Sequence, residues 1–188
     1  MDVNRGKASL DERKRKENML SGLYQEHYDK IARYAYVRIG NKAEAEDVAG
    51  EVFLRALKSL DTYQQHDIPM RAWLYKIAHN LVIDYSRKMA KRKTVPIDDL
   101  PLVSKENPEA TAEKNVEIER VKKAMKFLTD AQREVLNLRI FGGLTSREAG
   151  QILKKGDGAV REMQRAAIEK LRAVLLETDE IPMDNTKK

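Results

Sequence analysis

Residues 128–176 read LTDAQREVLNLRIFGGLTSREAGQILKKGDGAVREMQRAAIEKLRAVLL, and this stretch decides how the C-terminal part of the chain folds. Apolar residues recur at helical spacing before and after the Gly142–Gly143 pair. Thr145 followed by Glu148 is the pattern of a capping box, so a short helix is predicted to begin there. A Lys-Lys-Gly sequence interrupts it, and Asp157 can cap a second helix. Such a pair is typical of a helix-turn-helix, which can dock in the major groove of DNA.

The outward face of this helix pair is basic. Its cations are Arg147, Lys154, Lys155, Arg161 and Arg165, and two acids, Glu148 and Glu162, dilute them. Two short amphipathic helices at an angle also occur in helical proteins that bind no DNA. The motif alone therefore favours DNA binding without deciding it.

Composition narrows the class of protein. The 188 residues carry a net charge of +6, with 35% charged and 41% hydrophobic residues, so the chain should be attracted to polyanions. Seven Lys and Arg and one acid lie in residues 71–93, whereas residues 94–119 hold seven acids and two Lys. The absence of cysteine excludes disulfides, thiolate zinc sites and cysteine nucleophiles. No apolar run is long enough to span a bilayer, and the N-terminus lacks the apolar core of a secretory signal peptide. We therefore expect a cytoplasmic protein without membrane insertion.

Three helices are predicted in the N-terminal half, at about residues 19–39, 42–60 and 70–92. Gly40 stops the first, Asn41 caps the second, and Pro69 suits the start of the third. The apolar positions of these helices are expected to be buried, Leu57 among them, as is Ile140 in the C-terminal half.

The predicted fold is therefore all-α, with two small helical domains joined by a flexible linker. Three of the five prolines lie in the linker, where no helical period survives. The predicted segments are a flexible tail (1–18), a first domain (19–93), an acidic linker (94–115), a second domain (116–177) and a flexible tail (178–188).

No catalytic residue, metal ligand or cofactor is expected. The three histidines, His27, His66 and His79, lie on three different elements, and no HExxH, GxxxxGK[ST] or GxSxG motif is present. The acidic pairs Asp98–Asp99 and Asp179–Glu180 fall in predicted loops, where solvation is the simpler explanation.

The predicted third helix has aromatic residues among its cations, namely Trp73, Tyr75 and Tyr85. Aromatic rings beside Lys and Arg suit single-stranded DNA, because bases stack on the rings while the cations hold phosphates. The alternative is that Trp73 and Tyr85 belong to the core, which we favour for Trp73.

Three sequence segments that occur in a fixed order indicate a protein family more specifically than any one of them alone. AEAEDVAGEVFLRALKSLDTY (43–63), MRAWLYKIAHNLVIDYSRKMAKR (70–92) and LTDAQREVLNLRIFGGLTSREAGQIL (128–153), with an acidic linker before the last, together resemble the extracytoplasmic-function (group IV) sigma factors of the sigma-70 family. The resemblance covers about residues 19–92 and 116–176. It implies a subunit that directs bacterial core RNA polymerase to promoters, without catalysis.

The resemblance also implies three surfaces. The beta-prime clamp of core polymerase would bind the second helix at Glu46, Asp47, Val48, Glu51, Val52 and Arg55. The third helix and the loop before it would recognise and melt the −10 element through His66, Asp67, Ile68, Arg71, Tyr75, Lys76, His79, Asn80, Asp84, Arg87 and Lys88. The last helix would read the −35 element through Arg161, Glu162 and Arg165, with Arg147, Lys155, Asp157 and Gly158 at phosphates.

The partners implied are the beta-prime clamp and beta flap of core polymerase, promoter DNA as duplex and single strand, and an anti-sigma factor. Where many members have Gly-Thr-Val-Lys-Ser-Arg, this chain has GAVREM (158–163), so a promoter sequence cannot be taken from other members. Two other readings stay open. One is a DNA-binding regulator that needs no polymerase, and the other is a helical nucleic-acid enzyme, which metal dependence would identify.

Overall fold

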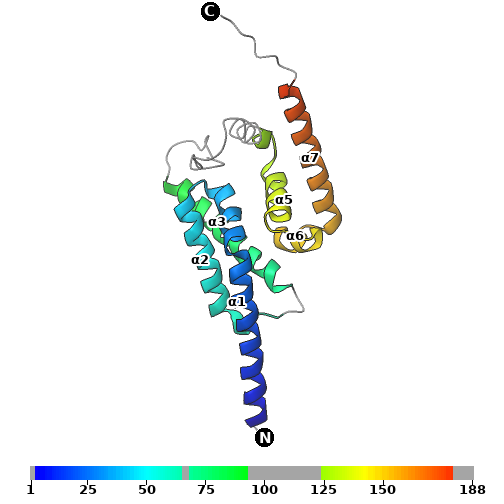
Figure 1. Ribbon diagram of the computed structural model, residues 1–188. Coiled ribbons are helices and arrows are strands. Elements are labelled where there is room, and N and C mark those ends of the chain that lie inside the picture. Colours follow the sequence, from blue (N-terminus) through cyan, green and yellow to red (C-terminus); the bar gives the residue numbers. More distant parts are fainter. Residues whose placement is uncertain (1–2, 65–67, 93–123, 180–188) are drawn as a thin grey trace, which may run out of the picture.

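The computed structural model describes residues 3–64, 68–92 and 124–179, and every regular element in these ranges is helical (Figure 1). The fold is therefore all-α, as predicted. The elements are α1 (Val3–Ile39), α2 (Lys42–Lys58), the short 3₁₀ helix η1 (Leu60–Thr62), α3 (Met70–Arg92), α5 (Asp130–Ile140), α6 (Ser146–Leu153) and α7 (Asp157–Asp179). The predicted linker, residues 94–115, lies outside the described residues, as does the start of the predicted second domain. None of the described helices is long and apolar enough to cross a bilayer.

Helix ends follow the predicted local signals. Gly40 has a positive φ of 75° directly after α1. The Asn41 side chain then accepts a hydrogen bond from the Glu44 amide at 3.2 Å, which caps α2. Both halves of the capping box between Thr145 and Glu148 are present at the start of α6.

The start of α1 differs from the prediction. The helix begins at Val3 rather than near Met19, and its N-terminal part projects past the end of α2 (Figure 1). This part has no apolar stripe to signal a helix. Salt bridges one turn apart support it, at 3.0 Å between Arg13 and Glu17 and 3.1 Å between Lys16 and Glu12.

Helices α1, α2 and α3 pack together around one apolar core (Figure 1). Its fully buried side chains include Ile31, Tyr34, Val52, Leu60, Leu74, Tyr75 and Val82. Two predicted core residues are instead exposed: Leu57 on α2 by 46% and Ile140 on α5 by 64%. Both lie on helix faces that no described element covers, so the prediction of their burial was wrong.

The C-terminal helices pack among themselves and also on the N-terminal bundle. Within the group, α7 contacts α5 and α6; between the groups, α6 lies against α3, and α5 against α1. One continuous cluster of buried apolar side chains crosses this boundary and includes Tyr34, Tyr75, Val135, Leu138 and Leu144. The two predicted domains therefore share an apolar interface in this structure.

Candidate nucleic-acid and polymerase interfaces

Most of the residues predicted to bind polymerase lie on an open face of α2. Glu46, Asp47 and Arg55 are exposed, and Val48 and Glu51 are half-buried. Arg55 donates to Glu51 at 2.6 Å, and this hydrogen bond lowers the pKa of the Glu51 carboxyl. Val52 is fully buried in the core, so only its neighbours are presented to a partner.

Two exposed leucines extend the acidic face of α2. Leu54 and Leu57 are 45% and 46% exposed, close to the acidic positions on the same helix. Exposed apolar side chains beside charges are typical of protein interfaces. The sequence did not identify Leu57 as an exposed residue, because its helical spacing also fitted a position in the core.

The predicted −10 residues of α3 divide into two stripes. Lys76, Asn80, Asp84 and Lys88 follow one another at intervals of four residues, so they share one face, and all are exposed, as is Arg87. Arg87 lies 3.9 Å from Asp84. This open stripe of α3 can meet a nucleic acid in the present arrangement.

The second stripe of α3 is Arg71, Tyr75 and His79, and it faces the C-terminal helices. Arg71 pairs with Glu148 of α6 at 3.2 Å, and the Tyr75 hydroxyl donates to the Phe141 carbonyl at 3.3 Å. Tyr75 is fully buried, and this burial raises the pKa of its hydroxyl. The chain itself therefore covers Tyr75 fully and most of His79, whereas the Arg71 side chain stays 35% exposed.

The predicted −10 loop is described only in part. Ile68 is buried, with 8% of its surface exposed, and His66 and Asp67 lie outside the described residues. The predictions for these two side chains stay predictions.

Glu134 of α5 is the centre of the contact between the two helical groups. Only 4% of it is exposed. The Tyr34 hydroxyl donates to its Oε1 at 2.5 Å, the His79 ring Nδ1 lies 2.9 Å from the same oxygen, and Arg38 pairs with Oε2. A carboxylate this deeply buried needs such partners to compensate for lost water.

His79 is held neutral at this contact. Burial, and the positive charge of Arg38, lower its pKa to about 4. The neutral ring can then donate its Nδ1–H to Glu134. Asn137 adds a second polar link, because its Nδ2 donates to the Tyr34 carbonyl at 3.2 Å.

Glu148 makes contacts both within α6 and with α3. It caps α6 by accepting from the Thr145 amide at 2.7 Å, and it pairs with Arg71 of α3. Burial acts to raise the pKa of its carboxyl, but the hydrogen bonds from Thr145 and the charge of Arg71 together lower it. The residue that shapes the helix-turn-helix thus also holds it against α3.

The predicted −35 surface lies mainly on α7 and is open. Arg161, Glu162 and Arg165 are exposed, as are Gly158, Arg147 on α6 and Lys155 in the turn, while Asp157 is half-buried at the helix start. Arg161 pairs with Asp157 at 2.7 Å, and Arg165 pairs with Glu162 at 2.5 Å and with Glu169 at 3.0 Å.

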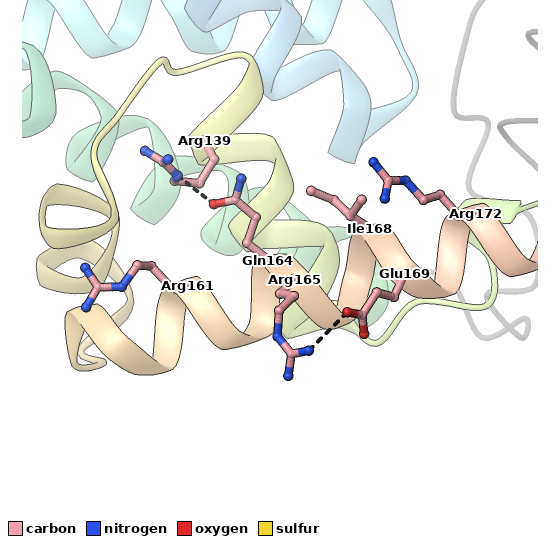
Figure 2. A pocket seen from close by; sticks show the side chains of 7 residues that line it. All are labelled: Arg139, Arg161, Gln164, Arg165, Ile168, Glu169 and Arg172. Atoms are coloured by element: carbon pink, nitrogen blue, oxygen red, sulfur yellow. Dashed lines mark hydrogen bonds and ion pairs between the residues drawn. The ribbon is translucent and has the colours of Figure 1, made fainter.

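A basic groove of about 400 Å³ runs between α7 and α5 (Figure 2). Four arginines line it: Arg139, Arg161, Arg165 and Arg172, together with Gln164, Ile168 and Glu169. Arg139 is held in place by a hydrogen bond of 2.8 Å to Gln164 (Figure 2). Sequence reasoning missed Arg139, since only the fold brings α5 beside α7, and it missed Arg172, which lies farther along α7 than the predicted contact residues. Four guanidinium groups suit an anionic partner such as the DNA backbone.

No three His, Asp or Glu side chains within the described ranges lie close enough together to hold a metal ion. Three open surfaces lie within the described residues: the acidic and apolar face of α2, the open stripe of α3, and the basic face of α7.

Two family models match the chain. "Sigma-70 region 2" covers residues 23–92, and "Sigma-70, region 4" covers residues 124–173. The chain is 31% identical over 148 residues to the ECF RNA polymerase sigma factor SigD of Mycobacterium tuberculosis, covering 76% of this chain and 70% of SigD. It is 32% identical over 155 residues to the ECF RNA polymerase sigma factor BldN of Streptomyces coelicolor, covering 81% of this chain and 59% of BldN.

Solved structures share the fold. CnrH in complex with the cytosolic domain of CnrY gives a TM-score of 0.64 at 24% identity, covering 92% of this chain and 96% of CnrH. The sigma factor RpoE of Bartonella quintana, in complex with the anti-sigma factor NepR, gives a TM-score of 0.67 at 20% identity, covering 85% of this chain and 98% of RpoE.

Proposed function

Because the chain belongs to the extracytoplasmic-function sigma factors of the sigma-70 family, we propose that it directs bacterial core RNA polymerase to specific promoters. One observation supports the proposal most strongly. Each of the two matched regions has an exposed surface whose charge and polarity suit the partner proposed for it. These are acids beside exposed leucines on α2, and arginines on α7. The protein would act by binding and strand separation, not as an enzyme.

We assign one surface to each partner. The α2 face around Asp47 would bind the beta-prime clamp, and the beta flap would bind the C-terminal helices. The open stripe of α3 would hold the single-stranded −10 element, with Lys76 and Lys88 at phosphates. The outer face of α7 would enter the major groove at the −35 element, where Arg161 and Arg165 reach base edges or phosphates.

The covered stripe of α3 adds a requirement. Tyr75 and His79 can take part in −10 recognition only after α5 and α6 have left α3, and Arg71 is fully available only once it has released Glu148. We therefore propose that the described arrangement is a resting form, and that polymerase and promoter favour an opened one. An anti-sigma partner that binds the resting form would keep the protein inactive. The RpoE structure, which holds an anti-sigma factor, supports such a partner for this chain. The proposed place of action is the cytoplasm.

The test is transcription by purified core polymerase. Run-off transcription on genomic fragments with the full chain should yield discrete starts, from which a promoter is taken. With that promoter, Arg161→Ala should lower −35-dependent transcription and relax base preference there by about 1–3 kcal/mol. Lys170→Ala removes a cation from the opposite face of α7 and should change neither.

Asn80→Ala addresses strand opening, because Asn80 lies on the open stripe of α3. Permanganate reactivity of promoter thymines should fall in this variant, while duplex binding through α7 persists. If the wild-type chain binds duplex DNA tightly alone and never opens it with polymerase, the protein is a DNA-binding regulator that needs no polymerase.

A further inference from the structure

The first part of α1 has no assigned role, because the region 2 match begins only at residue 23. In the structure this part is helical, and two of its cations reach the chain just before α3. We propose that Arg13 and Lys16, here called the N-terminal clamp, are positioning residues for the loop that precedes α3. The inference rests on the proposed function, in which this loop takes part in −10 recognition.

Lys16 makes the stronger contact of the clamp. Its Nζ donates to the Tyr63 carbonyl at 2.9 Å, a contact between residues 47 positions apart, and its side chain is only 19% exposed. Glu12 also pairs with this ammonium group, at 3.1 Å. A charge-assisted hydrogen bond with a half-buried donor is harder to replace with water than a fully exposed one.

Arg13 makes the second contact. Its Nη1 donates to the Asp61 Oδ2 at 2.7 Å, while its Nε donates to Glu17 at 3.0 Å. Both Arg13 and Asp61 are largely exposed, so this pair alone adds little to overall stability. Its effect is local, because Asp61 lies in η1, two residues before Tyr63.

Tyr63 connects the residue held by Lys16 to the other end of the loop. It is 96% buried, since 4% of its surface is exposed, and its hydroxyl donates to the Ile68 carbonyl at 3.0 Å. Its ring packs on Trp73 of α3, with centroids 4.9 Å apart. One residue thus ties the two ends of the loop together, and Lys16 holds the backbone of that residue.

This arrangement fits a role in binding rather than in folding alone. A loop whose ends are fixed loses less conformational freedom when it binds a base. The clamp holds one end of the loop directly and, through Tyr63, the other end where the chain enters α3. Lys14, one position from Arg13, has no hydrogen-bond or ion-pair partner among the described residues and is exposed, which makes it a matched control.

The experiment uses the full chain in holoenzyme with core polymerase, on the promoter found by run-off transcription. Lys16→Met keeps the aliphatic stem and removes the donor. Combined with Arg13→Ala, it should lower permanganate reactivity at the −10 thymines about fivefold to tenfold. Affinity for core polymerase and for a duplex carrying only the −35 element should stay unchanged. Lys16→Arg restores a donor and should restore opening, whereas Lys14→Met should have no effect.

The outcomes separate the two proposals. If the wild type opens the promoter and the double variant opens it equally well, the clamp has no positioning role, and the proposed function stands. A loss of opening in Lys14→Met of the same size would reveal a general charge effect and overturn the inference. A parallel loss of core binding and helicity would make the clamp merely structural. If the wild type opens no promoter at all, the proposed function itself fails.

Discussion

At the residue scale, the contact of His79 with Glu134 makes stability depend on pH. Burial and Arg38 lower the folded-state pKa of His79 to about 4, whereas the unfolded chain should protonate it near pH 6.5. The stabilisation is therefore fully present above about pH 6.5 and is lost as the pH falls toward 4. At pH 5.5 the loss should be about 1 kcal/mol.

Urea unfolding at pH 7.5 and pH 5.5 measures this dependence. His79→Gln keeps a polar side chain without a titrating ring, so its free energy of unfolding should change less between the two pH values. Burial also lowers the pKa of His27, which will retain part of the dependence in the variant. An identical pH dependence in wild type and variant would contradict the burial of a neutral His79.

Gly143 contributes to stability through its backbone conformation. It has a φ of 59° between α5 and α6, a conformation that costs other residues about 1–2 kcal/mol. Gly143→Ala should therefore lower the free energy of unfolding by roughly that amount, measured by urea denaturation. Gly50→Ala is the control, because Gly50 lies inside α2 with open space around it, and it should raise stability by up to about 1 kcal/mol. Equal effects of both changes would contradict this.

At the element scale, α2 offers a test of the polymerase surface. Asp47 is exposed and Glu51 half-buried, one turn apart on α2, so replacing both with Lys reverses the charge of that face without entering the core. Binding to core polymerase should be lost, while helicity by circular dichroism stays unchanged. The same reversal at Glu26 and Asp29 on α1 changes the net charge equally and should preserve binding. Assembly of the α2 variant at wild-type affinity would show that this face is not the interface.

Elements whose ends are marked by local chemistry were predictable from sequence. Asn41 and Thr145 cap the helices that they were expected to cap, and α3 follows Pro69 as expected. The first part of α1 was missed, because it has no apolar stripe, and its charge pairs include one with Asp61, which lies far along the chain. Leu57 and Ile140 were misplaced because helical spacing gives a face but not the neighbour that covers it.

At the scale of the whole molecule, the packing of α5 and α6 on α3 was not predictable. Glu134 reads as an ordinary polar residue in the QREV sequence, and only the tertiary fold brings Tyr34, Arg38 and His79 around it. The same packing places Tyr75, expected at DNA, inside the apolar cluster. Contacts between residues about a hundred positions apart have no sequence period to mark them.

Glu134 should therefore hold the resting form closed. Glu134→Ala removes the carboxylate and leaves the fully buried Tyr34 hydroxyl and the half-buried Arg38 guanidinium without this partner. Breaking a buried pair on one side costs about 3–5 kcal/mol, and separation of the two helical groups would return these groups to water. The variant should shift the chain toward the opened form.

The absence of cysteine allows this shift to be measured directly. Cysteines at Lys91, near the end of α3, and at Lys170 on α7 can carry a donor and an acceptor dye, since both positions are exposed. Glu134→Ala should lower energy transfer in the free chain toward the value that the wild type reaches with core polymerase. Asp29→Ala, which removes an exposed acid from α1, should not. Unchanged transfer in Glu134→Ala would show that this ion pair does not keep the two groups together, and that the apolar cluster and the other polar contacts across their boundary do.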